Sequence, residues 1–201
     1  FVTVFAKLNK LLKNISKNTP AQNNEKESKM ISSPNCLKLI QHFENCELKA
    51  YPDIFGVPTI GWGHTDGVKL GMTCTQAQAD KWLKDEIHSF EAQVLKALNK
   101  DHIEVNQNQF DALVCFSYNL GTYTLVHGSR KAPVTKIGQL WQNLKDDHFD
   151  KAAEKFTLYA NGGVRGLVIR RTAESMLFKG QMTIDEILDW VRQEQSKKSS
   201  K

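Results

Sequence analysis

The sequence predicts an α+β fold that is mainly helical, with one small antiparallel β element near the front of the chain. Over most of the 201 residues, apolar side chains recur at three- and four-residue spacing, which is typical of helices packed on a core. Residues 51–65 differ, because glycines, prolines and β-branched residues are mixed there as in a hairpin. The chain is long enough for one good core, and no apolar run in it is long enough to span a membrane.

The first helix is expected to begin with Ser33 as its N-cap and Pro34 in its first turn. Its buried stripe is expected at Leu37, Ile40, Phe43 and Leu48. After the hairpin, residues 75–78 should cap a helix that runs to about Leu98. A very apolar helix over 106–118 should follow, ending at Asn119-Leu120-Gly121. Further helices are expected over 137–144, 149–159, 167–179 and 184–193, with a break at 161–163.

The net charge of +5 belongs to the two ends of the chain. Residues 1–29 contain six lysines and two glutamates, and residues 196–201 contain three lysines. The body between them therefore carries a net charge of −2. A nucleic-acid-binding domain needs a basic stripe on its folded body, so the sequence argues against nucleic acid as a partner.

The four cysteines lie far apart and form no Cys-x-x-Cys motif, so their spacing is poor for a zinc site. Cys115 falls in an apolar helical run and is expected to be a small core residue. A Cys36–Cys46 disulfide is left open for a chain that works outside the cytoplasm.

One short stretch combines two acids and a hydroxyl at the predicted boundary between helix and hairpin. Glu44 lies at the end of the first helix, and Asp53 and Thr59 lie in the hairpin. Glycoside hydrolysis needs one carboxyl group that holds a proton for the leaving oxygen and a second that is ionised. An acid at a helix end near apolar side chains, such as Glu44, is suited to hold the proton, and an acid in a solvated hairpin, such as Asp53, is suited to stay ionised. The Thr59 hydroxyl can hold a water against Asp53. The alternative is an ordinary surface acid and an ordinary turn residue.

These residues resemble the signature of the phage-type lysozymes, glycoside hydrolase family 24. The resemblance rests first on Glu44, Asp53 and Thr59 at this spacing, with the run Thr-Ile-Gly-Trp-Gly-His over residues 59–64. The apolar segment 109–121 and the segment 162–178, which holds Arg170 and Arg171, resemble two further family segments. The likeness covers about residues 31–180 and does not include the two ends.

The resemblance implies a two-lobed, lysozyme-like domain that cleaves the β-1,4 bond between N-acetylmuramic acid and N-acetylglucosamine in peptidoglycan. It implies Glu44 as general acid, Asp53 as base or electrostatic partner, and Thr59 as the residue that positions water, with inversion as the outcome. It implies no metal and no organic cofactor. Residues expected to face the saccharide are His64, Tyr118, Asn119 and Asn161.

Three residues with expected roles also have a structural interpretation. For His64, a hydrogen bond that fixes the turn is favoured over a role in catalysis. Arg170 and Arg171 could clamp an acidic group of the substrate, but such a pair more often packs and forms salt bridges on its helix.

The chain divides by sequence into residues 1–29, a catalytic domain over 30–180, and a helix with a basic tail over 181–201. Residues 1–17 have the pattern of a basic amphipathic helix, and 18–29 that of a linker. Residues 1–17 have three open interpretations: a solvated or disordered extension, a segment that binds anionic lipid or lipopolysaccharide, and the end of a removed membrane anchor. The membrane-binding lysines would be Lys7, Lys10, Lys13 and Lys17.

We expect a monomeric endolysin of a phage or prophage that collects in the host cytoplasm, crosses with the help of a holin and then degrades the periplasmic wall. Two alternatives remain. A lytic transglycosylase would use Glu44 alone and close an anhydro ring on the sugar, which the pairing of Asp53 and Thr59 argues against. A non-catalytic wall- or membrane-binding protein would kill through its amphipathic helix.

Overall fold

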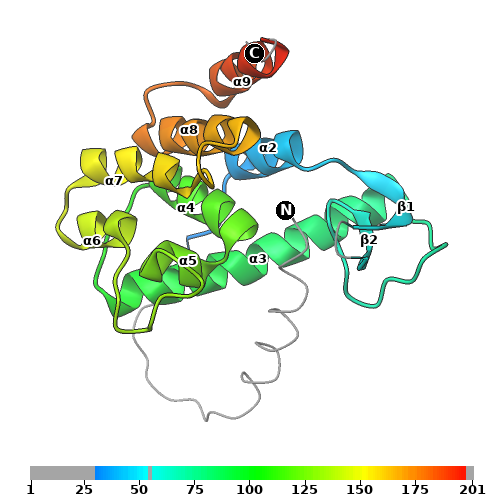
Figure 1. Cartoon of the computed structure of the whole chain (residues 1–201), viewed down its shortest axis with the longest axis horizontal. Helices are drawn as coiled ribbons and strands as arrows, with labels where there is room; N and C mark the ends of the chain where they lie inside the picture. Colours follow the sequence, from blue (N-terminus) through cyan, green and yellow to red (C-terminus); the bar gives the residue numbers. More distant parts are fainter. Residues whose placement is uncertain (1–29, 54–55, 198–201) are drawn as a thin grey trace. The chain divides into compact units, whose positions relative to one another are not determined.

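The structure, a computed structural model, describes residues 30–53 and 56–197. Helices dominate, and one two-stranded antiparallel sheet lies near the front of the chain, which confirms the predicted fold class (Figure 1). The described residues form two compact units. The smaller comprises 44–53 and 56–88, and the larger comprises 30–43 and 89–197. The long helix α3, Gln76–Lys100, contributes residues to both units.

The smaller unit is built on a hairpin and the first half of α3. Strand β1, Glu47–Pro52, pairs with β2, Pro58–Gly61, so that Tyr51 lies opposite Thr59. A bulge between Glu47 and Tyr51 interrupts the ladder. Gly61 allows β2 to lie close to α3, since a Cβ at Gly61 would stand 3.1 Å from the Cβ of Ala79, and its φ of 64° favours glycine.

The larger unit is a helical assembly around α4, Gln107–Leu120, whose residues from Phe110 to Asn119 are all buried. The other helices are α2 (Pro34–Phe43), α5 (Thr122–His127), α6 (Gln139–Lys145), α7 (Phe149–Lys155), α8 (Arg165–Lys179) and α9 (Ile184–Ser196), with a 3-10 turn η1 (Phe156–Tyr159). Helices α2, α5 and α8 each pack on α4. Each fully buried Phe or Leu contributes about 1.5–3 kcal/mol of hydrophobic stabilisation, so α4 is the core of this unit.

Helices α3, α4 and α9 begin with capping boxes, whereas α5, α6, α7 and α8 have no side-chain hydrogen bond at their N-caps. Asn106 and Gln109 form a capping box at the start of α4, and Thr75 and Gln78 do the same before α3. The predicted break at 161–163 is confirmed, because Asn161, Gly162 and Gly163 all have positive φ angles. Helix α9 buries Ile184, Ile187, Leu188 and Val191 and packs on α8 and α2.

The boundary between the first helix and the hairpin was predicted wrongly, since β1 begins at Glu47 and not at residue 51, and helix α5 was not predicted. Leu48 does not continue the buried stripe of the first helix, because α2 ends at Phe43 and Leu48 lies in β1 with 39% of its surface exposed. The Leu48 carbonyl accepts the Cys74 N–H at 2.9 Å, a bond to a distant part of the chain. The bond to Cys74 therefore uses the backbone carbonyl that a longer helix would have needed.

The cysteines are free thiols. Cys115 is buried in the core as expected, but the Cys36–Cys46 disulfide that the sequence left open is not formed. The Cys36 sulfur lies 3.4 Å from the Cys115 sulfur, whereas the Cys46 sulfur contacts the Gln76 amide. Within the part of the chain that the structure describes, no helix is both long and apolar enough to cross a membrane.

Candidate active site

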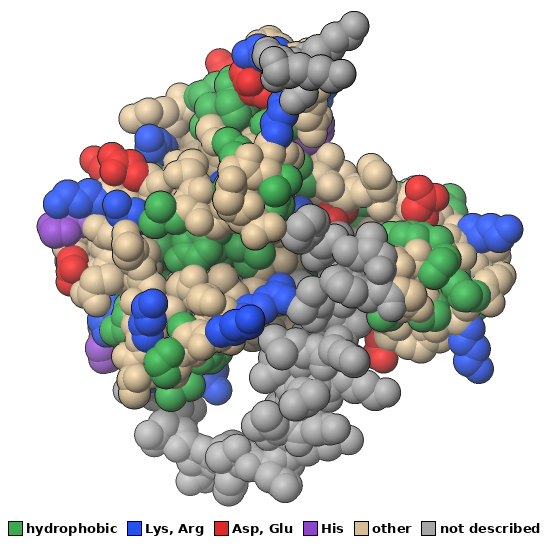
Figure 2. All heavy atoms as spheres, in the orientation of Figure 1, with side chains coloured by type: hydrophobic (Ala, Val, Ile, Leu, Met, Phe, Trp, Pro, Cys, Tyr) green, Lys and Arg blue, Asp and Glu red, His purple; other side chains and the backbone are tan. Residues whose placement is uncertain are grey.

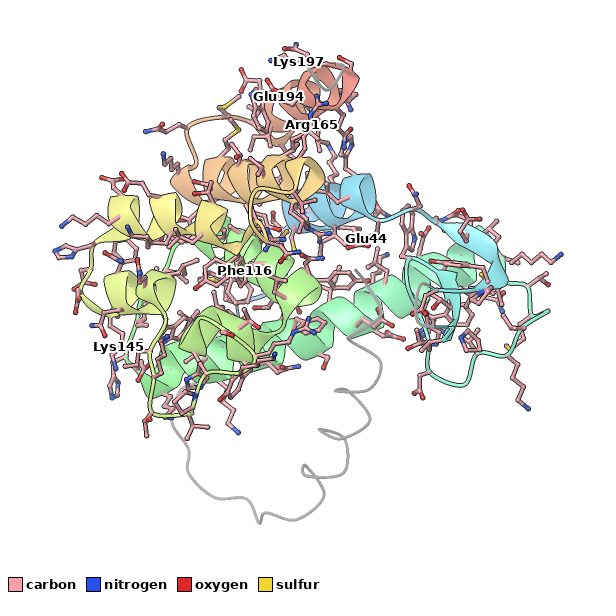
Figure 3. The ribbon with its side chains drawn as sticks, viewed as in Figure 1. Glu44, Phe116, Lys145, Arg165, Glu194 and Lys197 are labelled. Atoms are coloured by element: carbon pink, nitrogen blue, oxygen red, sulfur yellow. The ribbon has the colours of Figure 1, made fainter. Side chains whose placement is uncertain are left out.

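Glu44 is the first residue after α2 and is 5% exposed (Figure 3). The start of α2 is anchored by Asp111 of α4, which is fully buried. Asp111 accepts the Ser33 N–H at 2.9 Å, the Gln107 amide at 2.8 Å and the Ser33 hydroxyl. Burial raises the pKa of Asp111 against the opposing effect of these hydrogen bonds. The helix that leads to Glu44 is therefore fixed at its first turn.

The other end of α2 is held by a buried charged cluster on α8. The Arg170 guanidinium lies over the ring of Phe43, 5.4 Å from its centroid, and Phe43 directly precedes Glu44. Glu174 pairs with Arg170 at 3.3 Å and with Arg171 at 3.0 Å, and all three side chains are buried. This confirms the packing and salt-bridge interpretation of the two arginines.

Asp53 follows β1 directly and is held by its own turn. Its side-chain Oδ1 accepts the Val57 N–H at 2.8 Å, and its backbone N–H donates to the Val57 carbonyl at 3.0 Å. The Asp53 carbonyl accepts the Gly56 N–H at 2.9 Å. The two backbone bonds close the turn, and the bond from the Val57 N–H orients the carboxylate within it.

Thr59 lies in β2 and is fully buried. Its hydroxyl donates to the Val57 carbonyl at 3.0 Å, the same carbonyl that accepts the Asp53 N–H. Val57 therefore links Asp53 and Thr59 through its backbone. Because the Thr59 proton is used in this bond, the oxygen presents its lone pairs as an acceptor.

Tyr51 is a candidate that the sequence analysis missed. It lies opposite Thr59 in the hairpin, so these two side chains belong to one face, and it precedes Asp53 by two residues. Burial raises the pKa of Tyr51, and the negative charges of Glu47, Glu44 and Asp53 raise it further. The phenol is thus close to both candidate acids and keeps its proton at neutral pH. The spacing of two between Tyr51 and Asp53 was the sequence signal that could have identified it.

His64 makes the contacts of a residue that holds a turn. Its ring stacks on Trp82 with centroids 4.5 Å apart, and its Nδ1 lies 2.8 Å from a Glu86 oxygen. Its backbone exchanges two 2.8 Å hydrogen bonds with Ile60. These contacts support the structural interpretation, and a contact between His64 and the saccharide stays a prediction.

The remaining expected site residues lie in the larger unit. Tyr118 is 6% exposed and meets Phe90 edge to face, and the Asn119 side-chain oxygen accepts from Arg171 at 2.7 Å. Asn161 is exposed in the left-handed turn before α8. Contacts of these three residues with the saccharide also stay predictions. Lys7, Lys10, Lys13 and Lys17 lie outside the described residues.

Comparison with known proteins gives consistent matches. The family model described as phage lysozyme matches residues 41–174, which include Glu44, Asp53 and Thr59. The endolysin of Lactococcus phage c2 is 38% identical over 151 residues, covering 73% of this chain and 59% of that protein. The endolysin of Salmonella phage P22 is 35% identical over 153 residues, covering 73% of this chain and 96% of that protein.

Solved structures show the same similarity. An endolysin from Escherichia coli O157:H7 phage FAHEc1 superposes with a TM-score of 0.64 at 30% identity, covering 78% of this chain and 98% of that one. A P22 lysozyme variant superposes with a TM-score of 0.60 at 31% identity, covering 75% and 99%. The chain thus matches nearly the whole length of these lysozymes, but 59% of the length of the Lactococcus phage relative.

Proposed function

Since this chain belongs to the phage lysozyme family, we propose that it is a muramidase that hydrolyses the β-1,4 bond between N-acetylmuramic acid and N-acetylglucosamine in bacterial peptidoglycan. The observation that carries the proposal is the hairpin geometry, in which Val57 joins Asp53 to Thr59 within the unit that also contains Glu44. This arrangement supplies the two carboxyl groups that hydrolysis with inversion needs, together with a fixed hydroxyl.

Glu44 is proposed as the general acid. It is a buried carboxyl group at the end of a helix whose first and last turns are both fixed. A fixed position lets the carboxyl proton reach the leaving oxygen of the glycosidic bond without a search over rotamers. Replacement of Glu44 by glutamine should therefore remove the protonation step and leave the fold intact.

Asp53 and Thr59 are proposed to hold the attacking water. Each presents an acceptor, the Asp53 carboxylate and the Thr59 hydroxyl oxygen, so one water can donate one proton to each. The water lone pair then points away from both and can attack the anomeric carbon on the face opposite the leaving group. Asp53 takes the proton as the new bond forms, and the configuration inverts. Tyr51, which is neutral and lies opposite Thr59, is proposed to donate a hydrogen bond to the Asp53 carboxylate.

Product analysis in ¹⁸O-labelled water tests the reaction. Hydrolysis by the full chain should give muropeptides with a reducing muramic acid that carries one ¹⁸O at its anomeric carbon. A lytic transglycosylase would give 1,6-anhydromuramic acid without label, and a binding protein would give no new ends. Either of the last two results would overturn the proposed reaction.

We further propose that the enzyme is a monomer that stays in the host cytoplasm until lysis, and that residues 30–180 form its catalytic part. Lys7, Lys10, Lys13 and Lys17 are proposed to draw it to anionic lipid or lipopolysaccharide, since they share one side of the amphipathic pattern over 1–17. Replacing these four lysines with glutamine should reduce killing of intact Gram-negative cells from outside. Hydrolysis of purified wall should be unchanged, and equal killing by the variant would contradict this role.

A further inference from the structure

Residues 128–138 connect α5 to α6, and we call them the α5–α6 loop (Figure 1). Its two ends meet at Gly128 and Gly138, so closely that a Cβ on Gly138 would stand 2.6 Å from the Gly128 nitrogen. The Gly138 N–H also donates to the Val126 carbonyl at 2.8 Å. Two loop ends this close together are typical of an Ω-loop, a class of loop that frequently carries function.

The inside of the loop is tied to α5. The Tyr123 hydroxyl donates to the Ala132 carbonyl at 2.6 Å, and the His127 ring Nδ1 lies 2.7 Å from the Lys136 carbonyl. Two further turns close within the loop, from Ala132 N–H to Ser129 and from Lys136 N–H to Pro133. The loop therefore holds one conformation and presents its side chains in fixed places, although a much shorter connection could join two helices.

The charged residues of the loop are all basic. No Asp or Glu occurs anywhere from residue 112 to residue 145. Lys145 is paired with Asp101, but Arg130, Lys131 and Lys136 are exposed and form no ion pair with any of the described residues. The body of the chain carries a net negative charge, so these three cations make the loop a local region of positive charge.

The tip of the loop is also apolar. Val134 is 72% exposed, the highest value among the large hydrophobic residues that the structure describes, and Ile137 is 39% exposed. Both lie between or beside the cations in sequence, and Figure 2 shows Lys or Arg side chains next to hydrophobic ones over the region of α5 and α6. A soluble anionic polymer would satisfy the charges and leave Val134 in water. A bilayer interface satisfies both, because its surface is anionic and its interior is apolar.

We propose that the α5–α6 loop is a membrane-docking surface, which places Val134 at the headgroup boundary of an anionic phospholipid bilayer while Arg130, Lys131 and Lys136 contact lipid phosphates. The surface belongs to the folded part of the chain and includes none of the proposed catalytic residues. It would keep the enzyme at the envelope while the hairpin acts on the wall.

Vesicle binding by the full chain tests this surface, and because no wall is present the result does not depend on the proposed hydrolysis. The loop variant carries Arg130→Gln, Lys131→Gln and Lys136→Gln. The control variant carries Lys96→Gln, Lys151→Gln and Lys179→Gln. These three lysines are exposed, and their replacement removes the same amount of charge. Each lysine or arginine at an anionic surface contributes about a fivefold change in affinity, so the loop variant should bind phosphatidylglycerol vesicles on the order of 100-fold more weakly. The control should change by no more than a few-fold, since residues 1–29 are the same in both.

The apolar tip has its own pair of variants. Val134→Ser should weaken vesicle binding about fivefold, whereas Leu158→Ser, which is 60% exposed on η1, should not. Equal vesicle binding by the loop and control variants would overturn the proposal. So would a loop variant that loses binding to soluble polyphosphate as strongly as to vesicles while Val134→Ser has no effect, since that result assigns the loop to an anionic polymer.

Discussion

Replacing Asp111 with alanine should destabilise the protein more than any single surface substitution, because Asp111 anchors the helix that leads to Glu44. The change removes an acceptor of three hydrogen bonds, two of them at 2.8 and 2.9 Å. Hydrogen bonds to a charged group contribute about 1.5–3 kcal/mol each. Burial of the carboxylate away from water costs free energy in the wild type, as its raised pKa indicates, and alanine avoids this cost. The balance is a loss of about 3 kcal/mol, or roughly 6–12 °C in Tm for a chain of this size.

Urea and thermal unfolding followed by circular dichroism measure this loss. Asp111→Asn keeps one acceptor and should cost about 1 kcal/mol, and the control Asp85→Ala, which breaks an exposed pair with Lys81, should cost less than about 0.5 kcal/mol. A loss below about 1 kcal/mol for Asp111→Ala would refute the anchoring argument.

The pH dependence of the same variants gives a second check. Because burial raises the pKa of Asp111 above its usual 3.8, the native state takes up a proton more readily than the unfolded chain. That stabilisation is complete below the unfolded pKa and is lost as the pH rises through the raised value. Asparagine cannot take up the proton, so the stability gap between wild type and Asp111→Asn should be wider at about pH 4 than at about pH 7. A gap that does not change with pH would contradict the raised pKa.

Three further predictions concern single side chains. Thr59→Val should lower kcat on peptidoglycan about 100-fold with little change in Tm, whereas Thr59→Ser should keep most of the activity; equal rates for the two would contradict a role of the hydroxyl. Tyr51→Phe should lower kcat about tenfold, and the control Tyr123→Phe, which loses a hydrogen bond outside the site, should not. The pKa of Asp101 is lowered by the Trp141 N–H bond at 2.6 Å and by Lys145. Asp101→Asn should therefore cost about 1 kcal/mol in urea unfolding at pH 7. This difference should shrink as the pH falls below the usual value for Asp and through the lowered pKa, and a difference that does not change with pH would refute the assignment.

The sequence predicted the features that depend on local chemistry. The cap at residues 75–78 marked the start of α3, and the run of Asn161, Gly162 and Gly163 marked the break before α8. The candidate site residues were proposed from spacing and resemblance, and the structure adds the turn that joins Asp53 to Thr59.

Features that depend on distant contacts were not predictable. Leu48 continues a helical pattern, but its carbonyl bonds to Cys74, far along the chain. Asp111 bonds to Ser33 across 78 positions, and nothing near either residue in the sequence indicates the pairing. Val57 acts only through its backbone, so its side chain carries no signal of its link to Asp53 and Thr59.

The central claim is that Glu44 protonates the leaving group during hydrolysis of peptidoglycan. The most direct test is the rate at which Glu44→Gln releases reducing ends from purified wall, with Glu47→Gln, an exposed acid three residues away in β1, as the matched control. We expect Glu47→Gln to retain the wild-type rate and Glu44→Gln to fall by about 1000-fold or more while keeping its Tm. A Glu44→Gln variant within tenfold of the wild-type rate would contradict the account.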